Sequence, residues 1–91
     1  MSRIEWDQAK AESNLRKHGV GFDEATTVLS DPFSIHRFDT KHSAAEPRFV
    51  VVGTSLADRV LVVVYTDDGS TIRLLSARRA TKRERHEYEF A

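Results

Sequence analysis

Residues 48–79 read RFVVVGTSLADRVLVVVYTDDGSTIRLLSARR, and this stretch decides the fold. Its β-branched and aromatic runs predict three strands, at Arg48 to Thr54, Arg59 to Thr66 and Ser70 to Ala77. The connectors between these runs are short and carry turn residues, so the strands should form an antiparallel meander. The middle run is apolar on both faces from Val60 to Val64, which predicts that it forms the centre of the sheet.

Two helices are predicted near the start of the chain. Asp7 is a good N-cap, residues Gln8 to His18 contain neither Gly nor Pro, and Gly19 follows directly. We therefore expect a helix over Gln8 to His18. Asp23 is expected to cap a second, shorter helix, which Asp31-Pro32 ends because the residue before a proline disfavours helical geometry.

The remaining segments complete a small α+β fold. Ile4 to Trp6 predicts a short N-terminal edge strand, and Phe33 to Phe38 predicts a further strand before a polar loop, Asp39 to Pro47. Thr81 to Glu84 matches the capping box, which begins a helix predicted over Lys82 to Phe90. The expected fold is an antiparallel sheet, made of a three- or four-stranded meander and the N-terminal strand, flanked by two N-terminal helices and one C-terminal helix.

Length and composition limit the class of protein. The chain has 91 residues, of which 40% are hydrophobic and 31% charged, as is typical of one soluble domain over residues 1–91. It contains no cysteine, so disulfides and thiolate metal sites are excluded. Neither a signal peptide nor a membrane anchor is expected, because the N-terminus has no apolar h-region and the longest apolar runs are far shorter than the ~20 residues of a spanning helix. We expect a soluble, cytoplasmic protein.

Basic and acidic residues balance over the whole chain but not along it. Fourteen Lys and Arg equal fourteen Asp and Glu, so no net field draws the molecule to nucleic acid. The final stretch, residues 73–91, nevertheless holds six basic and three acidic side chains, which predicts a local basic patch. The basic residues of this patch are Arg73, Arg78, Arg79, Lys82, Arg83 and Arg85.

Several functional classes lack their signatures. The four histidines, His18, His36, His42 and His86, do not have the spacing of a zinc site, which argues against metal catalysis. No glycine-rich phosphate loop and no nucleophile elbow is present, so nucleotide-binding and serine hydrolase functions are disfavoured. A DNA-binding module remains an alternative, although there is no helix-turn-helix with a basic recognition helix.

The end of the last strand is the first candidate site. Arg78 and Arg79 lie there, next to the N-terminus of the final helix, and guanidinium groups beside free helix N–H groups bind phosphate. Arg73 must either face solvent or have a defined anionic partner, because an unpaired buried charge is costly. The alternative is that the basic residues only solvate the exposed helix and pair with its acidic ones, Glu84, Glu87 and Glu89.

The loop from His42 to Arg48 is the second candidate site. Three residues of this loop, His42, Glu46 and Arg48, offer the groups needed to cleave a phosphodiester without a metal. These groups are a base for the 2′-hydroxyl, an acid for the leaving oxygen and a cation for the developing charge. An ordinary solvated loop is the alternative.

Residues along the whole chain resemble the BrnT family of type II toxins. In the first half, the matching residues are Trp6-Asp7, Lys10, Asn14, Lys17-His18-Gly19-Val20, Phe22, Ala25 and Asp31-Pro32. In the second half, they are His42-Ser43, Glu46, Arg48, Gly53, Arg73, Ser76-Ala77-Arg78, Ala80, Glu84-Arg85 and Tyr88. Single matches have little specificity, but their order over 91 residues is specific.

The resemblance implies a fold like that of RelE-type ribonuclease toxins and an enzyme that cuts RNA, so that translation stops and growth is arrested. No cofactor is expected. The resemblance also implies a BrnA-like antitoxin, which neutralises the toxin and contacts operator DNA for the complex. The expected assembly is a heterotetramer of a toxin dimer with two antitoxins.

Both arguments direct attention to the same two segments. Arg78 and Arg48 are expected to hold the scissile phosphate or its developing charge, and His42 or Glu46 to move a proton. The residues expected to bind RNA are Arg73, Arg79, Lys82 and Arg83. The rival hypothesis is a non-catalytic protein that binds a partner protein through its basic and apolar surface, which zero net charge favours over a free RNA binder.

Overall fold

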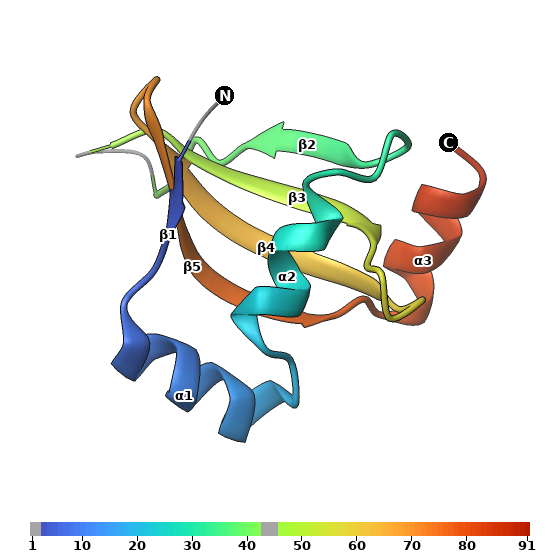
Figure 1. Ribbon diagram of the computed structural model, residues 1–91. Coiled ribbons are helices and arrows are strands. Elements are labelled where there is room, and N and C mark those ends of the chain that lie inside the picture. Colours follow the sequence, from blue (N-terminus) through green and yellow to red (C-terminus); the bar gives the residue numbers. More distant parts are fainter. Residues whose placement is uncertain (1–2, 43–45) are drawn as a thin grey trace.

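The meander predicted from residues 48–79 forms the centre of the fold in the computed structural model (Figure 1). The structure describes residues 3–42 and 46–91. Its elements follow in the order β1 (Arg3–Glu5), α1 (Gln8–His18), α2 (Phe22–Val28), β2 (Ile35–Phe38), β3 (Arg48–Thr54), β4 (Val60–Asp67), β5 (Thr71–Arg79) and α3 (Lys82–Glu89). The predicted α+β class, with two helices before the meander and one after it, is therefore confirmed.

The strands lie side by side in the order β1-β5-β4-β3-β2, so β4 is central, as its doubly apolar sequence predicts. Strands β2 to β5 pair antiparallel with their neighbours in sequence. β1 pairs with β5 in parallel, with Glu5 opposite Arg73, so the sheet is mixed rather than wholly antiparallel. Only two residues separate β1 from α1, and α1 packs against β5. β1 must therefore run towards α1, which makes it parallel to β5.

One face of the sheet, here called the helical face, forms the core. Val51, Val63 and Ala77 lie opposite one another on β3, β4 and β5, and all are fully buried. Helix α2 crosses this face (Figure 1). It contributes the buried residues Phe22, Ala25 and Val28.

The opposite face, here called the open face, is lined by α3 only at one end, as far as the described residues show. Side chains alternate along a strand, so the registers of β2 to β5 identify the residues of this face. Valines occupy its middle: Val50, Val52, Val62 and Val64. Arginines occupy its borders: Arg37, Arg48, Arg73 and Arg78.

The predicted caps of α1 and α3 are confirmed. Asp7 accepts a hydrogen bond from the Lys10 backbone N–H at 3.1 Å, and Gly19 ends α1 in the left-handed conformation, with φ of 68°. Thr81 and Glu84 form both hydrogen bonds of the capping box. The prediction that Asp23 caps α2 is wrong. The N-cap is Gly21, the helix begins at Phe22, and Asp23 lies in its first turn.

The boundaries of four strands also differ from the prediction, and β4 is shifted by one residue, to Val60–Asp67. β1 covers Arg3–Glu5, because Trp6 leaves the strand and packs edge-on against Phe22. β2 begins only at Ile35, because the backbone N–H groups of Phe33 and Ser34 donate hydrogen bonds to Asp31, which holds these two residues in a turn. β5 continues to Arg79, because its last two residues still pair with β4.

Asp31 also joins α2 to β3 and α3. Its Oδ2 atom accepts hydrogen bonds from the Thr54 backbone N–H, at 2.8 Å, and from the Tyr88 hydroxyl. The approach is so close that a Cβ atom on Gly53 would lie 2.9 Å from a Val28 methyl group and 3.0 Å from the Asp31 carboxylate. Glycine is therefore required at residue 53.

Asn14 joins α1 to the edge of β5. Its side-chain amide is 7% exposed and donates to the Ala77 carbonyl at 2.7 Å and to the Val20 carbonyl at 3.0 Å. Its carbonyl oxygen accepts from the Ala77 N–H at 3.1 Å. The amide thus takes the place of a neighbouring strand, beyond the point where β1 ends.

We expect Asn14→Ala to lower the free energy of unfolding by about 3 kcal/mol, because three buried backbone groups lose their partner. Urea denaturation of the purified protein measures this change. Ser13→Ala, at the exposed preceding residue of α1, is the matched control and should stay within about 0.5 kcal/mol of the wild type. Equal stabilities of the two variants would contradict the role given to Asn14.

Candidate functional site

A row of polar side chains crosses one end of the open face. Arg48 on β3 lies opposite Thr66 on β4, which lies opposite Arg73 on β5. Arg73 donates a hydrogen bond to Glu5 on β1 at 2.8 Å, and its side chain remains 57% exposed. Arg73 therefore satisfies both predicted conditions, since it faces solvent and has an anionic partner.

A bulge in β5 brings Arg73 and Arg78 to the same face. Residues five apart in a regular strand point to opposite faces. Here Ser76 pairs with Val64 while Leu74 pairs with Tyr65, so Leu75 is an extra residue that shifts the alternation. Both arginines consequently border the open face.

The loop before β3 joins His42 to this end of the sheet through Asp39. The Asp39 backbone N–H donates to the Arg48 carbonyl at 2.8 Å, which ties the start of the loop to β3. His42 Nδ1 lies 3.0 Å from Asp39 Oδ2, and the imidazole is 62% exposed. Glu46 is exposed in the bend that precedes β3. Ser43, which contributes to the resemblance, lies outside the described residues.

Asp39 orients the imidazole ring of His42 through its Nδ1 atom. Desolvation raises the pKa of Asp39, but hydrogen bonds from His42 and from the backbone N–H groups of Lys41 and His42 hold that pKa below its ordinary value. Asp39 is then a carboxylate at neutral pH and can only accept, so the His42 proton lies on Nδ1. In the neutral imidazole, the lone pair then lies on Nε2. Sequence reasoning missed Asp39, although an Asp three residues before a loop histidine is a recognisable turn pattern.

Arg78 lies at the other end of the open face, opposite Val62. Its Nη1 and Nη2 atoms donate to the two carboxylate oxygens of Glu84 at 2.7 and 2.9 Å. Hydrogen bonds from Arg78 outweigh desolvation and lower the pKa of Glu84 to about 2. The expected pairing of basic residues with α3 carboxylates is thus confirmed for Arg78, and also for Arg83, which lies 3.4 Å from Glu87.

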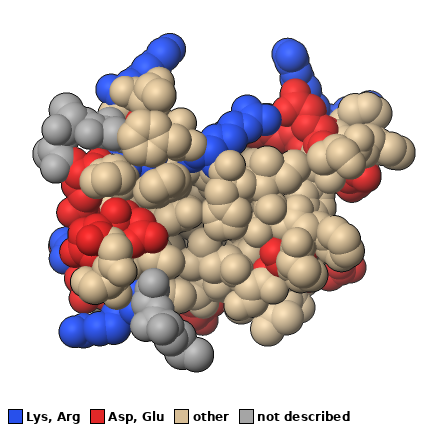
Figure 2. Space-filling model, turned by 90° about the horizontal axis from the view of Figure 1, so that it is seen from above, with Lys and Arg blue, Asp and Glu red and all other residues tan. Residues whose placement is uncertain are grey.

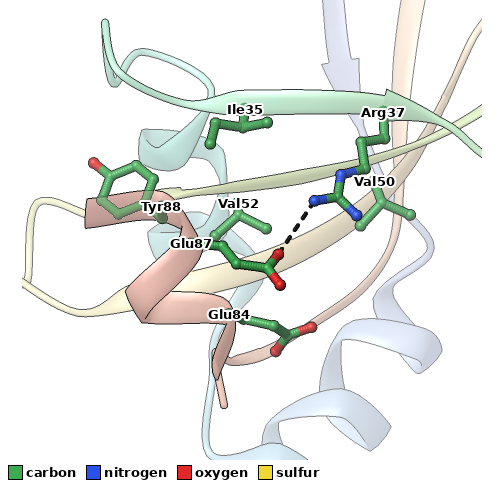
Figure 3. A pocket seen from close by; sticks show the side chains of 7 residues that line it. All are labelled: Ile35, Arg37, Val50, Val52, Glu84, Glu87 and Tyr88. Atoms are coloured by element: carbon green, nitrogen blue, oxygen red, sulfur yellow. Dashed lines mark hydrogen bonds and ion pairs between the residues drawn. The ribbon is translucent and has the colours of Figure 1, made fainter. Parts of the chain in front are cut away.

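The two arginines expected to share one phosphate are therefore not side by side. Strands are about 4.8 Å apart and rise about 3.3 Å per residue, so the Cα atoms of Arg48 and Arg78 are about 16 Å apart on the open face. A small pocket lies between one side of α3 and strands β2 and β3 (Figure 3). Arg37 borders this pocket and reaches Glu87 at 3.4 Å. Sequence reasoning missed Arg37, although alternation within β2 places it on the same face as Ile35.

The remaining candidate residues point elsewhere. Arg79 follows Arg78 in β5 and lies opposite Leu61, on the side of the helical face. Hydrogen bonds from Arg59 are the main cause of the lowered pKa of Glu24 on α2, and the charge of Arg79 adds to it. Lys82 and Arg83 are exposed on α3. The predicted basic patch is thus divided between two faces of the sheet and the last helix.

The side of the molecule that carries β2 has a largely uncharged surface, with charged side chains along its borders (Figure 2). Phe33, just before β2, is 77% exposed, and Phe38 at the end of β2 is 53% exposed. Within residues 3–42 and 46–91, no three His, Cys, Asp or Glu side chains gather as a metal site would require. None of the described helices has the length and apolar character needed to cross a bilayer.

Comparisons with known proteins agree with this architecture. A family model described as "Ribonuclease toxin, BrnT, of type II toxin-antitoxin system" matches residues 6–84. The 1.1 Å crystal structure of the Brucella abortus ribonuclease toxin BrnT matches with a TM-score of 0.65 and 22% sequence identity, over 90% of this chain and 100% of that chain. At this identity, the match shows a shared fold. No curated protein matches the chain.

Acid unfolding tests the Arg78–Glu84 pair. Because the pKa of Glu84 falls from 4.5 to about 2 on folding, its stabilisation is present above pH 4.5 and is lost as the pH falls towards 2. We expect Glu84→Gln to lose less stability than the wild type over this range, by at most about 3 kcal/mol. Chemical denaturation at a series of pH values measures the difference.

Glu89→Gln is the control for this measurement, because Glu89 is exposed on the same helix. It should follow the pH dependence of the wild type. If Glu84→Gln also follows the wild type down to about pH 2, the pair does not stabilise the fold.

Proposed function

The chain belongs to the BrnT family of ribonuclease toxins of type II toxin-antitoxin systems, and we propose that it is an endoribonuclease that cleaves RNA without a metal ion and thereby stops translation and growth. The observation that carries this proposal is the arrangement of the open face. Arginines surround a strip of valines there, and the loop attached to one end of this face carries a histidine that is held by a carboxylate. A single RNA strand can lie across such a face with its phosphates against the arginines.

The chemistry is proposed for the end that carries His42, Arg48 and Arg73. His42 Nε2 takes the proton from a ribose 2′-hydroxyl, whose oxygen attacks the adjacent phosphorus. The 5′-oxygen of the next nucleotide leaves and receives a proton from the carboxyl group of Glu46, which has to enter the step in its protonated form and is left as a carboxylate. Arg48 and Arg73 stabilise the negative charge that develops on the phosphate oxygens. The products are a 2′,3′-cyclic phosphate and a 5′-hydroxyl, and the step requires no oxidant, reductant or cofactor.

Other basic residues are proposed to bind the rest of the RNA strand. Arg78 holds a second phosphate at the far end of the open face, and Lys82 and Arg83 extend the cationic surface along α3. Arg79 contacts only RNA that passes around the end of the sheet, because it lies on the side of the helical face. In this proposal, contacts along the whole RNA strand determine the binding affinity, whereas the residues at the His42 end determine the rate of cleavage.

The family implies an antitoxin partner. We propose that this partner is BrnA-like, that a toxin dimer binds two copies of it in a heterotetramer, and that operator DNA is bound by the antitoxin alone. The exposed phenylalanines beside β2 support a protein partner on that side. We further propose that the chain acts in the cytoplasm as one domain of residues 1–91.

Cleavage in the presence of EDTA tests the activity. The purified protein should cut single-stranded RNA in EDTA and leave cyclic phosphate ends, and His42→Ala should lower the rate by about 100-fold or more, because the general base is lost. Gel electrophoresis and end-group analysis of the fragments measure both effects. His86→Ala, in the last turn of α3, should cleave at the wild-type rate. Intact RNA with the folded wild type, or cleavage only after a divalent ion is added, would overturn the proposal.

Growth of a bacterium that expresses the protein tests the role of the far arginine. We expect Arg78→Ala to relieve growth arrest at equal protein levels, because a phosphate ligand is lost. Arg16→Ala, on the exposed surface of α1, makes the same charge change and should remain toxic. A fully toxic, folded Arg78→Ala variant would remove Arg78 from the site.

A further inference from the structure

The guanidinium group of Arg78 has two kinds of edge. An arginine has five N–H donors, and three of those of Arg78 are used in the structure. Nη1 donates to Glu84 Oε1 at 2.7 Å and to the Arg79 carbonyl at 3.3 Å, and Nη2 donates to Glu84 Oε2 at 2.9 Å. One donor on Nη2 and the donor on Nε remain, and these two lie on the same edge of the group.

The remaining edge has the geometry of a phosphate-binding site. Its two N–H groups are parallel, and such a fork binds two oxygens of one phosphate. Within the described part of the chain, no acceptor lies within hydrogen-bond distance of this edge. The Arg78 side chain is 42% exposed, and its Nε atom is not among the buried polar atoms without a partner in the described residues, so solvent reaches this edge.

Glu84 is itself fixed in place. Its Oε1 atom accepts from the Thr81 backbone N–H at 2.8 Å, and its own backbone N–H donates to the Thr81 hydroxyl at 3.1 Å. Its side chain is only 29% exposed. The carboxylate that holds Arg78 is therefore anchored to the first turn of α3 and does not move freely with solvent.

We propose that Glu84 is a positioning residue, which holds Arg78 by the two Nη atoms so that the Nε–Nη2 edge is presented to a phosphate of RNA on the open face. The benefit is entropic, because a free arginine side chain loses rotamer freedom when it is immobilised on binding, whereas an arginine already held by Glu84 does not. The identity of the ligand rests on the proposed ribonuclease function.

The affinity of a single-stranded RNA that cannot be cleaved tests this inference. A fluorescently labelled 2′-O-methyl oligonucleotide lacks the attacking hydroxyl, so its dissociation constant reports binding alone, by fluorescence anisotropy. We expect Glu84→Gln to raise this constant about tenfold, because an amide has only one acceptor atom and cannot hold both Nη groups. Gln keeps the capping box, so α3 retains its first turn.

The direction in which Glu84→Gln changes the dissociation constant distinguishes a positioning role from the general effect of removing a negative charge. Removal of a negative charge by itself strengthens RNA binding, and Glu89→Gln, with the same charge change on the same helix, measures that effect. In an Arg78→Ala background, Glu84→Gln should cause no further loss of affinity. A purely structural role for Glu84 would weaken binding in both backgrounds and would overturn the proposal.

Two further outcomes would also overturn it. If Glu84→Gln binds the oligonucleotide as tightly as the wild type, Glu84 does not position Arg78. If it binds more tightly than Glu89→Gln, the carboxylate occupies the phosphate site and blocks it. If the wild type binds the oligonucleotide but does not cut ordinary RNA, the proposed cleavage fails, whereas the comparison of dissociation constants still decides the role of Glu84.

Discussion

The Asn14–Ala77 contact, together with the pairing of Ala77 with Val63, fixes β5 from both of its edges. The open face depends on this constraint, because β5 supplies core residues and the arginines of the proposed site in alternation. Ala77 faces the core while its neighbour Arg78 faces the opposite way, so a displacement of β5 by one residue would exchange apolar and charged side chains. The buried side-chain amide of Asn14, on α1, thus helps to fix the position of the arginines on the open face.

Charge compensation explains how a molecule of zero net charge carries four arginines on one face of its sheet. Arg73 and Arg37 pair with Glu5 and Glu87 in exposed contacts, which contribute only about 0–1 kcal/mol each, so a phosphate can replace the carboxylate at little cost. The bidentate pair of Arg78 is more buried and is held by the helix cap. The open face therefore has exchangeable cations at its borders and one fixed cation at the foot of α3.

Much of the fold follows from local sequence patterns. The hairpin spacing, the doubly apolar β4 and the caps at Asp7 and Thr81 are each encoded within a few residues, and all were predicted. The candidate site was predicted less well, because it depends on contacts between distant segments. The pairing of β1 with β5, the bulge at Leu75 and the hydrogen bond from Asp39 to β3 leave no periodic signal. The adjacent residues Arg78 and Arg79 suggest a single basic patch in the sequence. In the structure both still pair with β4, so their side chains lie on opposite faces of the sheet.

The central claim is that RNA lies on the open face of the sheet. Titration of isotope-labelled protein with the uncleavable oligonucleotide, followed by the NMR signals of valine methyl groups and arginine Nε–H groups, tests it most directly. We expect changes at Val50 and Val64 and at the arginines around them, with the core valines Val51 and Val63 unaffected. Changes confined to the surface of α1 and α2, with the open face silent, would contradict the account.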